Sequence, residues 1–311
     1  MKRTQVITEG AILLALFLLF LMIALYVPVI GTILLFILPL PFIIFTQRHG
    51  ISLSIVLLIT GCILSIIFGN VTNILIAAMF GSTGIVMGLM YRRRQTIGAI
   101  IGGSLAYTLG LIIIYIGTIY LLNIDLIKDS FQLMRDSIQQ SKSLINSLNP
   151  DVDVNQQIKQ VESGLKLMEV IIPSVIVITG VIFAFISHSF AIPILQRLRL
   201  DVPPIKLFRE MKLPTSLVWY YLFVTVLSMF KTDSGGFYYI AVSNIFIILQ
   251  FFIILQGCSF IFYYVYRKGL PKAIAYIAVI GSILIPILLY IVRILGIIDL
   301  CFPLRDKMEK K

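Results

Sequence analysis

The chain has 311 residues, of which 59% are hydrophobic and only 13% are charged, and its formal net charge is +11. Soluble domains carry about 25% charged residues, so this composition excludes an ordinary soluble domain. The positive charge lies in short breaks between apolar segments and forms no continuous basic face. We therefore expect no nucleic-acid partner.

Stretches without any charged residue make up most of the chain. A helix that crosses a bilayer needs about 20 apolar residues, which most of these stretches reach or exceed. They predict an all-α, polytopic membrane helix bundle embedded in the lipid bilayer. The seven stretches cover residues 10–47, 49–91, 95–124, 170–196, 213–230, 234–266 and 273–292.

The N-terminal region, residues 1–195, is expected to contain six spans. The first two stretches are each too long for one helix across a core of about 30 Å, so each predicts a hairpin. The first breaks near Pro28 and Gly31, with a kink at Pro39 and Pro41. No small-residue cleavage pattern follows the first helix, which predicts that this helix is retained. The expected helices cover residues 9–27, 30–46, 51–68, 71–91, 96–122 and 169–192.

Residues 123–168, between the fifth and sixth spans, carry two amphipathic stripes separated by the turn Asn149-Pro150-Asp151. This pattern predicts an extracytoplasmic helical hairpin whose apolar faces pack together or lie on the membrane rim. A structural cap and a mobile lid or docking surface are both open. The stripes comprise Ile127, Phe131, Met134, Ile138, Ile145 and Leu148, followed by Val154, Ile158, Val161, Leu165 and Met168.

A basic loop, residues 196–213, leads into the C-terminal region 214–311, where segments near 214–230, 237–266 and 272–296 are expected. Nine spans would place Arg305 and the basic tail outside, against the positive-inside rule. If the segment 214–230 were re-entrant, the chain would have eight spans, but Arg267 would then lie outside. We expect nine spans, with eight as the alternative.

The basic residues also predict orientation. The breaks on one side contain Lys and Arg, whereas the two tight turns on the other side contain none. Short cytoplasmic loops carry the Lys/Arg excess, so we expect a multi-pass protein of the cell membrane with a cytoplasmic N-terminus. The basic breaks contain Arg48, Arg92, Arg93, Arg94, Arg197, Arg199, Lys206, Arg209, Lys212, Arg267, Lys268 and Lys272.

Small residues recur four positions apart in the fourth and fifth expected spans, which favours close helix packing. In a second interpretation, Gly81 to Gly84 line a ligand cavity, in which hydroxyls and exposed backbone carbonyls bind a solute. The packing residues are Gly84, Gly88, Gly98, Gly102, Ala106 and Gly110. The candidate substrate-binding residues are Asn70, Asn73, Ser82 and Thr83.

Three ionisable residues fall within the apolar segments, where charge is costly. Glu9 opens the first expected helix, where an acid suits the helix dipole. His188 is expected to be a hydrogen-bonded interior residue. Arg293 either snorkels to the interface or pairs with an acid or an anionic ligand. Asn244, Gln250 and Gln256 are expected to join helices by side-chain hydrogen bonds.

The chain offers no set of acid, base and nucleophile, so we expect no catalytic residues and no enzyme. Cys62, Cys258 and Cys301 lie in separate segments without a neighbouring His, which predicts neither disulfides nor a metal site. We expect no cofactor. No phosphate-binding Gly-rich loop precedes a Lys, so an ATPase that drives transport would be a separate chain.

Several segments resemble the YybS-like multispanning membrane proteins of Gram-positive bacteria. The likeness covers most of the chain, but this family implies no particular activity. The segments are Thr4-Gln5-Val6-Ile7-Thr8-Glu9-Gly10-Ala11, Tyr26-Val27-Pro28, Leu38-Pro39-Leu40-Pro41, Arg48-His49-Gly50 and Arg293-Ile294-Leu295-Gly296-Ile297-Ile298-Asp299.

The spacing of Ala11 and Ala15 is similar to the Ala-x-x-x-Ala motif of the S components of energy-coupling-factor transporters. That resemblance implies a six-helix solute-binding bundle whose first helix docks on a partner driven by an ATPase module in trans. The hairpin 123–168 and the last three segments depart from this pattern.

We therefore expect a solute-binding or transport-related subunit similar to these S components. The alternative is a non-transporting scaffold or regulatory protein that recruits partners through the outer hairpin or the basic loop. An enzyme acting on lipid is a third class, for which Glu9, His188 and Arg293 would be the available groups.

Overall fold

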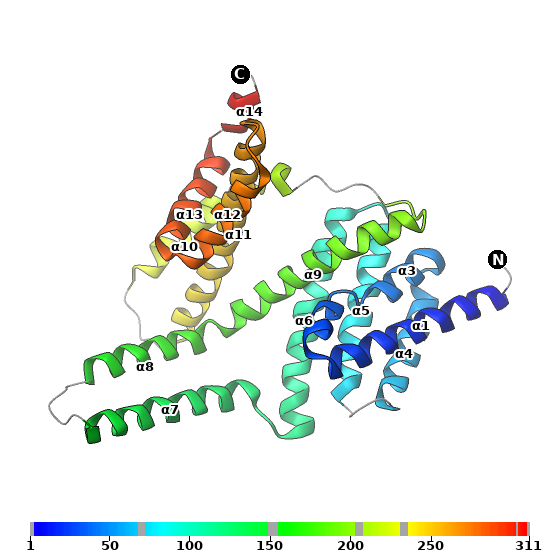
Figure 1. The fold of residues 1–311 in the computed structure, drawn as a ribbon, viewed down its shortest axis with the longest axis horizontal. Coiled ribbons are helices and arrows are strands. Elements are labelled where there is room, and N and C mark those ends of the chain that lie inside the picture. The colour runs from blue at the N-terminus through cyan, green and yellow to red at the C-terminus, as the bar shows by residue number, and fades with distance from the viewer. Residues whose placement is uncertain are drawn as a thin grey trace. The chain divides into compact units, whose positions relative to one another are not determined.

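The computed structural model describes residues 3–67, 72–148, 155–202, 208–230, 236–302 and 304–309 (Figure 1). Every regular element within these ranges is a helix, which confirms the expected all-α fold. Residue contacts divide the chain into two compact units. Unit 1 comprises Met1–Glu169 and Val175–Pro204, and unit 2 comprises Val170–Ser174 and Ile205–Lys311.

Helix formation follows from the apolar composition, because a segment without access to water must satisfy its own backbone hydrogen bonds. The helices that begin before Val175 are α1 Arg3–Tyr26, α2 Pro28–Leu35, α3 Leu40–His49, α4 Ile51–Ile67, α5 Thr72–Arg92, α6 Thr96–Leu122, α7 Leu126–Leu148, α8 Asn155–Val170 and α9 Ile172–Arg197. The remaining elements are the short 3-10 helix η1 Phe208–Glu210, then α10 Ser216–Ser228, α11 Phe237–Arg267, α12 Lys272–Leu284, α13 Pro286–Cys301 and α14 Leu304–Glu309.

Among the described residues, six helical segments are long and apolar enough to cross a membrane, or seven if the bent pair α12–α13 is one span. The expected count of nine spans is therefore not confirmed. The difference arises at α4 and α10, which are apolar but have only 17 and 13 residues. Both are shorter than the roughly 20 residues that a crossing requires.

The breaks within the first stretch follow its prolines. Val27 has an extended backbone before Pro28, as the proline ring demands of the preceding residue, and this ends α1. A turn over residues 36–39 then separates α2 from α3 where the kink is expected. The break expected at Gly69 and Asn70 lies outside the described residues.

The core of unit 1 is built around α5, which contacts α3, α4 and α6. Its glycines allow the helix backbones to approach. A Cβ atom on Gly84 would lie 2.5 Å from the carbonyl oxygen of Pro39, and one on Gly88 would lie 2.8 Å from that of Ile43. Gly102 and Gly110 of α6 similarly face α5 side chains, whereas Gly98 has looser contacts and Ala106 is half-buried.

Gly84→Ala should destabilise the protein by about 1–3 kcal/mol, because the added methyl group meets backbone atoms that cannot move aside cheaply. The measurement is thermal unfolding of the purified protein in detergent. Gly164→Ala in α8 is the matched control, since a Cβ there meets nothing within 4 Å. Equal melting temperatures for the two variants would contradict the close packing of α3 and α5.

The expected hairpin is present as α7 and α8, but the two helices do not pack closely along their lengths. Arg135 donates a hydrogen bond to Glu169 and joins one helix to the other. The apolar stripe of α7 stays open, with Met134 and Ile145 exposed to 50% and 38%. The described parts of α7 and α8 therefore do not pack along each other, and the expected alternative, in which the apolar faces lie on the membrane rim, stays a prediction. The turn 149–154 lies outside the described residues.

In unit 2, α11 and α13 run in the same direction in close contact. Gly257 and Gly296 permit this, because a Cβ on either would overlap a backbone carbonyl of the other helix. Gln256, next to Gly257, meets Asp299, and at the end of α11 Arg267 donates to the carbonyl of Met308 at 2.6 Å. Residues 304–308 therefore lie at the C-terminal end of α11.

A single segment was expected for residues 272–296, but the last apolar stretch forms two helices. Its two helices, α12 and α13, are bent by 118°. Pro286 begins α13 and holds Ile285 in an extended conformation, which explains the bend. Since α12 starts just after Arg267 and the tail returns to Arg267, the pair leaves and re-enters the same end of α11.

Asn244 of α11 joins α11 to the break between α8 and α9. Its side-chain amide donates to the carbonyl of Val170 at 2.7 Å, and its side-chain oxygen accepts from the N–H of Ser174 at 2.8 Å. The break leaves both backbone groups without a helical partner. Asn244 therefore makes the helix-joining hydrogen bonds expected from the sequence.

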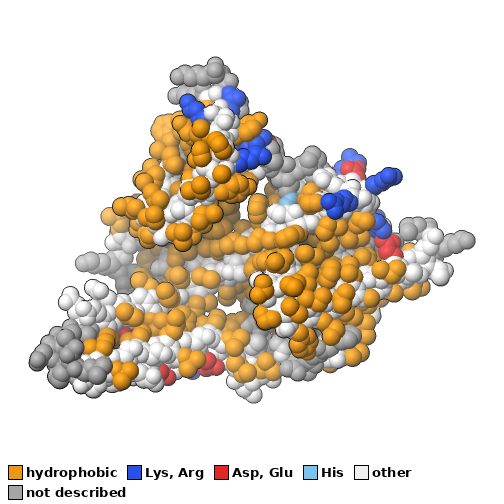
Figure 2. All heavy atoms as spheres, in the orientation of Figure 1, with side chains coloured by type: hydrophobic (Ala, Val, Ile, Leu, Met, Phe, Trp, Pro, Cys, Tyr) orange, Lys and Arg blue, Asp and Glu red, His pale blue; other side chains and the backbone are white. Residues whose placement is uncertain are grey.

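Figure 2 shows hydrophobic side chains over most of the visible helical surface, as a lipid environment requires. Lys and Arg side chains of unit 1 gather near the end at which α9 stops. The exposed arginines at the ends of α5 and α9 are Arg92, Arg93, Arg94, Arg197 and Arg199.

The return of the tail predicts the side on which Cys301 lies. In a Cys62→Ser, Cys258→Ser background, Cys301 should react with a membrane-impermeant maleimide from the same side as Lys268→Cys, because the residues that follow Cys301 return to Arg267 at the end of α11. Phe237→Cys, at the opposite end and 87% exposed, should react from the other side. Labelling of Cys301 together with Phe237→Cys would show instead that α12 and α13 form one complete crossing.

Candidate functional site

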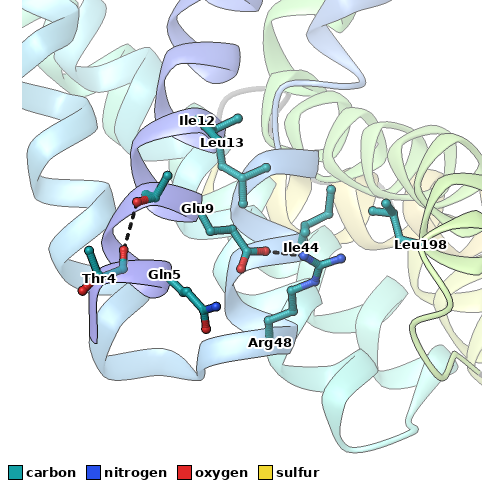
Figure 3. Close-up of a pocket in the computed structure, with 9 residues that line it drawn as sticks. Thr4, Gln5, Glu9, Ile12, Leu13, Ile44, Arg48 and Leu198 are labelled. Atoms are coloured by element: carbon teal, nitrogen blue, oxygen red, sulfur yellow. Dashed lines mark hydrogen bonds and ion pairs between the residues drawn. The ribbon is translucent and has the colours of Figure 1, made fainter. Parts of the chain in front are cut away.

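A pocket of about 490 Å³ opens between α1, α3 and the residue that follows α9 (Figure 3). Both charged and apolar groups line it. Glu9 and Arg48 point toward each other from α1 and α3, and Leu198 faces them from the other side. The full lining is Thr4, Gln5, Thr8, Glu9, Ile12, Leu13, Ile44, Arg48 and Leu198.

Glu9 is held by two basic side chains of α3. Arg48 donates to one of its carboxylate oxygens, and His49 Nε2 lies 2.9 Å from the other. The side chain of His49 is only 4% exposed, whereas those of Glu9 and Arg48 are 20% and 33% exposed. The ion pair is therefore anchored from within and open to the pocket.

The expectation that Glu9 opens the first helix is wrong. The helix already begins by Arg3, which places Glu9 in its second turn. The stabilising effect of the helix dipole on an acid fades beyond the first turn. The carboxylate is stabilised by Arg48 and His49 instead, residues that sequence reasoning did not connect with it.

The outer face of α1 next to the pocket carries both alanines of the four-residue motif. Ala11 and Ala15 are exposed, and the larger exposed side chains of Ile12 and Leu19 lie beside them. Because an alanine side chain ends at Cβ, the surface of α1 is lower at these two positions than at Ile12 and Leu19, and we call this low surface the notch. Its shape suits the close approach of another helix.

The candidate substrate-binding residues do not line this pocket. Asn70 lies outside the described residues, and Asn73 is buried near the start of α5. The hydroxyls of Ser82 and Thr83 both donate to the carbonyl of Met79, within their own helix. A solute site built from these residues stays a prediction.

His188 lies in the interior of unit 1, where its Nδ1 is 2.6 Å from the hydroxyl of Tyr91. One residue earlier, Ser187 forms a 2.8 Å hydrogen bond with Tyr107. These pairs join α9 to α5 and α6, and His188 is a hydrogen-bonded interior residue, as expected from the sequence. A buried polar group without such a partner would be costly.

Arg293 is half-buried on α13 and lies over an aromatic ring, with its guanidinium carbon 4.6 Å from the centroid of Tyr290. A cation over an aromatic face gains electrostatic stabilisation. This contact was not among the partners expected for Arg293.

Unit 2 contains a buried polar network that sequence reasoning missed. Arg305 forms a bidentate pair with Asp299, at 2.9 and 2.6 Å, and Gln256 donates to the same carboxylate at 2.5 Å. Arg305 also donates to the carbonyl of Arg209 and to Ser259. The N–H donors of Arg305 therefore join α14 to α11, α13 and η1.

A signal for this network was present in the sequence. Asp299 is an acid at the end of a long apolar stretch, and a basic residue follows six positions later. Arg305 was weighed only for the side of the membrane on which the tail lies, and it was not considered as a partner of Asp299. The carboxylate of Asp299 is fully buried, which makes its pairing a condition of folding.

Asp299→Asn should destabilise the protein by about 3–5 kcal/mol, because it leaves the buried Arg305 without its counter-charge. Asp201→Asn is the control, since the exposed Arg94–Asp201 pair should contribute at most about 1 kcal/mol. Thermal unfolding in detergent measures both. Asp299→Leu combined with Arg305→Met should recover part of the lost stability, because it removes both buried charges. A double variant that is less stable than Asp299→Asn would contradict this account.

The chain is similar to known proteins over nearly its full length. The family model described as "Predicted membrane protein (DUF2232)" matches residues 15–300. A relative from Bacillus subtilis (strain 168), described as "Uncharacterized protein YybS", is 38% identical over 309 residues, which cover 99% of this chain and 100% of the relative. These matches confirm the YybS-like resemblance. No solved structure matches the chain.

Proposed function

The chain belongs to the DUF2232 family of predicted membrane proteins, and we propose that it serves as a membrane-embedded subunit of a solute-uptake system. The exposed face of α1 carries the proposal, because Ala11 and Ala15 lie one turn apart and no helix of the described residues covers them. Small residues allow close helix contact where lipid offers no hydrophobic drive for association. A partner membrane protein that presents a helix with small residues fits this face.

The make-up of unit 1 supports the likeness to the S components of energy-coupling-factor transporters. In that likeness, the partner is energised by ATPases in trans, and this chain supplies solute recognition without a catalytic step of its own. Five of the described helical segments that are long enough to cross a membrane lie wholly or mostly in unit 1, namely α1, α2–α3, α5, α6 and α9, and the shorter apolar helix α4 packs with them.

The charge distribution supports a cytoplasmic N-terminus. The pocket residues Glu9 and Arg48, together with Arg94 and Asp201, lie at one end of unit 1, where they form ion pairs. Basic residues concentrate on the cytoplasmic side of membrane proteins. In this orientation α7 and α8 are extracytoplasmic, and Asn73 lies toward the outer end of α5.

A second candidate function is a non-transporting scaffold that recruits partners through α7 and α8 or through the basic loop 196–213. The open apolar stripe of α7 favours it, since Met134 and Ile145 are exposed and none of the helices that the structure describes covers them. Exposed apolar surface outside a membrane core is typical of an interaction surface.

Affinity purification from the native host tests the first candidate. The wild-type chain should recover a membrane protein together with an ATPase, and Ala11→Leu combined with Ala15→Leu should reduce that recovery about tenfold by filling the notch, equivalent to about 1.4 kcal/mol. The yields are measured by quantitative mass spectrometry.

Ala273→Leu is the matched control, because Ala273 is exposed on α12 of unit 2 and should leave recovery unchanged. Recovery of no ATPase, with identical partners for the double variant and the wild type, would rule out the transport role. Partners lost on replacing Met134 and Ile145 by Ser would favour the scaffold.

A further inference from the structure

We propose that the pocket beside Glu9 and Arg48 binds a phospholipid whose headgroup carries both a phosphate and a primary ammonium group, as phosphatidylethanolamine does. The phosphate accepts hydrogen bonds from Arg48, and the ammonium donates to Glu9. The inference rests on the arrangement of the lining residues and does not depend on the transport role.

The lining changes from polar to apolar along the helices. On α1 the polar residues Thr4 and Thr8 come first. Ile12 follows, about 12 Å deeper than Thr4 at about 1.5 Å per residue. On α3, which runs the opposite way, Ile44 lies one turn deeper than Arg48. Both helices thus place polar groups at the end of a span and apolar groups further in, in the order of a headgroup and its acyl chains.

The ion pair at the pocket presents both signs of charge side by side. Arg48 offers several N–H donors suited to phosphate oxygens. Glu9 keeps its position when Arg48 turns toward a phosphate, because the buried His49 holds its second oxygen. Thr8 and Gln5 add polar groups at the mouth of the pocket.

Other ligand classes fit the same groups less well. An anionic headgroup without an amine leaves Glu9 facing a second negative charge. A quaternary ammonium has no N–H to donate to the carboxylate. A soluble polar phosphate ester makes no use of the apolar side chains of Ile12, Leu13 and Ile44 that line the pocket. A volume of about 490 Å³ holds a headgroup and glycerol, and the acyl chains continue over the exposed Ile12 and Leu19.

Native mass spectrometry of the full chain, released from micelles with equal amounts of phosphatidylethanolamine, phosphatidylglycerol and phosphatidylcholine, tests the proposal. The wild type should retain phosphatidylethanolamine about tenfold over the other two lipids, the factor expected of one charge-assisted hydrogen bond. Glu9→Gln should abolish this preference, and Arg48→Gln should lower the retention of all three lipids.

Arg94→Gln is the control, because Arg94 pairs with Asp201 at the same end of unit 1 but does not line the pocket. Ile12→Trp provides a variant that leaves the ion pair intact. Ile12 is 62% exposed, so the larger ring should be tolerated and should block retention by filling the pocket. It therefore keeps the proposal testable if Glu9→Gln fails to fold.

Soluble glycerophosphoethanolamine separates the lipid from a free phosphate ester. The lipid proposal expects no displacement of phosphatidylethanolamine by an equal concentration of this compound. Displacement at equal concentration, equal retention of the three lipids, or the same loss for Arg94→Gln as for Glu9→Gln would each overturn the proposal.

Discussion

The absence of water from the bilayer interior is the constraint on which the structure depends, because each crossing segment must pair its own backbone N–H and C=O groups. The chain meets this demand by forming helices over most of the described residues of its apolar stretches. At the break between α8 and α9, a side chain of another helix restores the pairing. In unit 2, Asn244 binds both backbone groups left open between Val170 and Ser174.

The same constraint governs the polar side chains. Inside unit 1, Tyr91 pairs with His188, and Tyr107 pairs with Ser187. In unit 2, the Asp299 carboxylate is surrounded by donors from Arg305 and Gln256. The Glu9 pair differs, since its charges remain partly exposed at the end of two spans. Buried pairs that are fully satisfied stabilise the fold, whereas an exposed pair beside a pocket is free to exchange partners with a ligand.

The two surfaces of α1 accordingly suit two kinds of neighbour. The notch at Ala11 and Ala15 offers shape without charge, which fits a helix of another membrane protein. The pocket beside Glu9 and Arg48 offers charge above an apolar wall, which fits a lipid. Because the two surfaces lie next to each other on one helix, a lipid held in the pocket would border any partner docked on the notch.

The sequence alone determined that this is an all-α membrane protein, where its apolar segments lie and where proline breaks the first of them. Those features depend on hydrophobicity and on local backbone sterics, which a single segment carries. It also identified Glu9 and His188 as costly groups, but it did not identify their partners. Only the tertiary structure decided that Glu9 meets Arg48 and His49, that Asp299 meets Arg305, and that the last stretch folds back on α11. Such pairings depend on how helices distant in sequence pack together, and no local pattern encodes that packing.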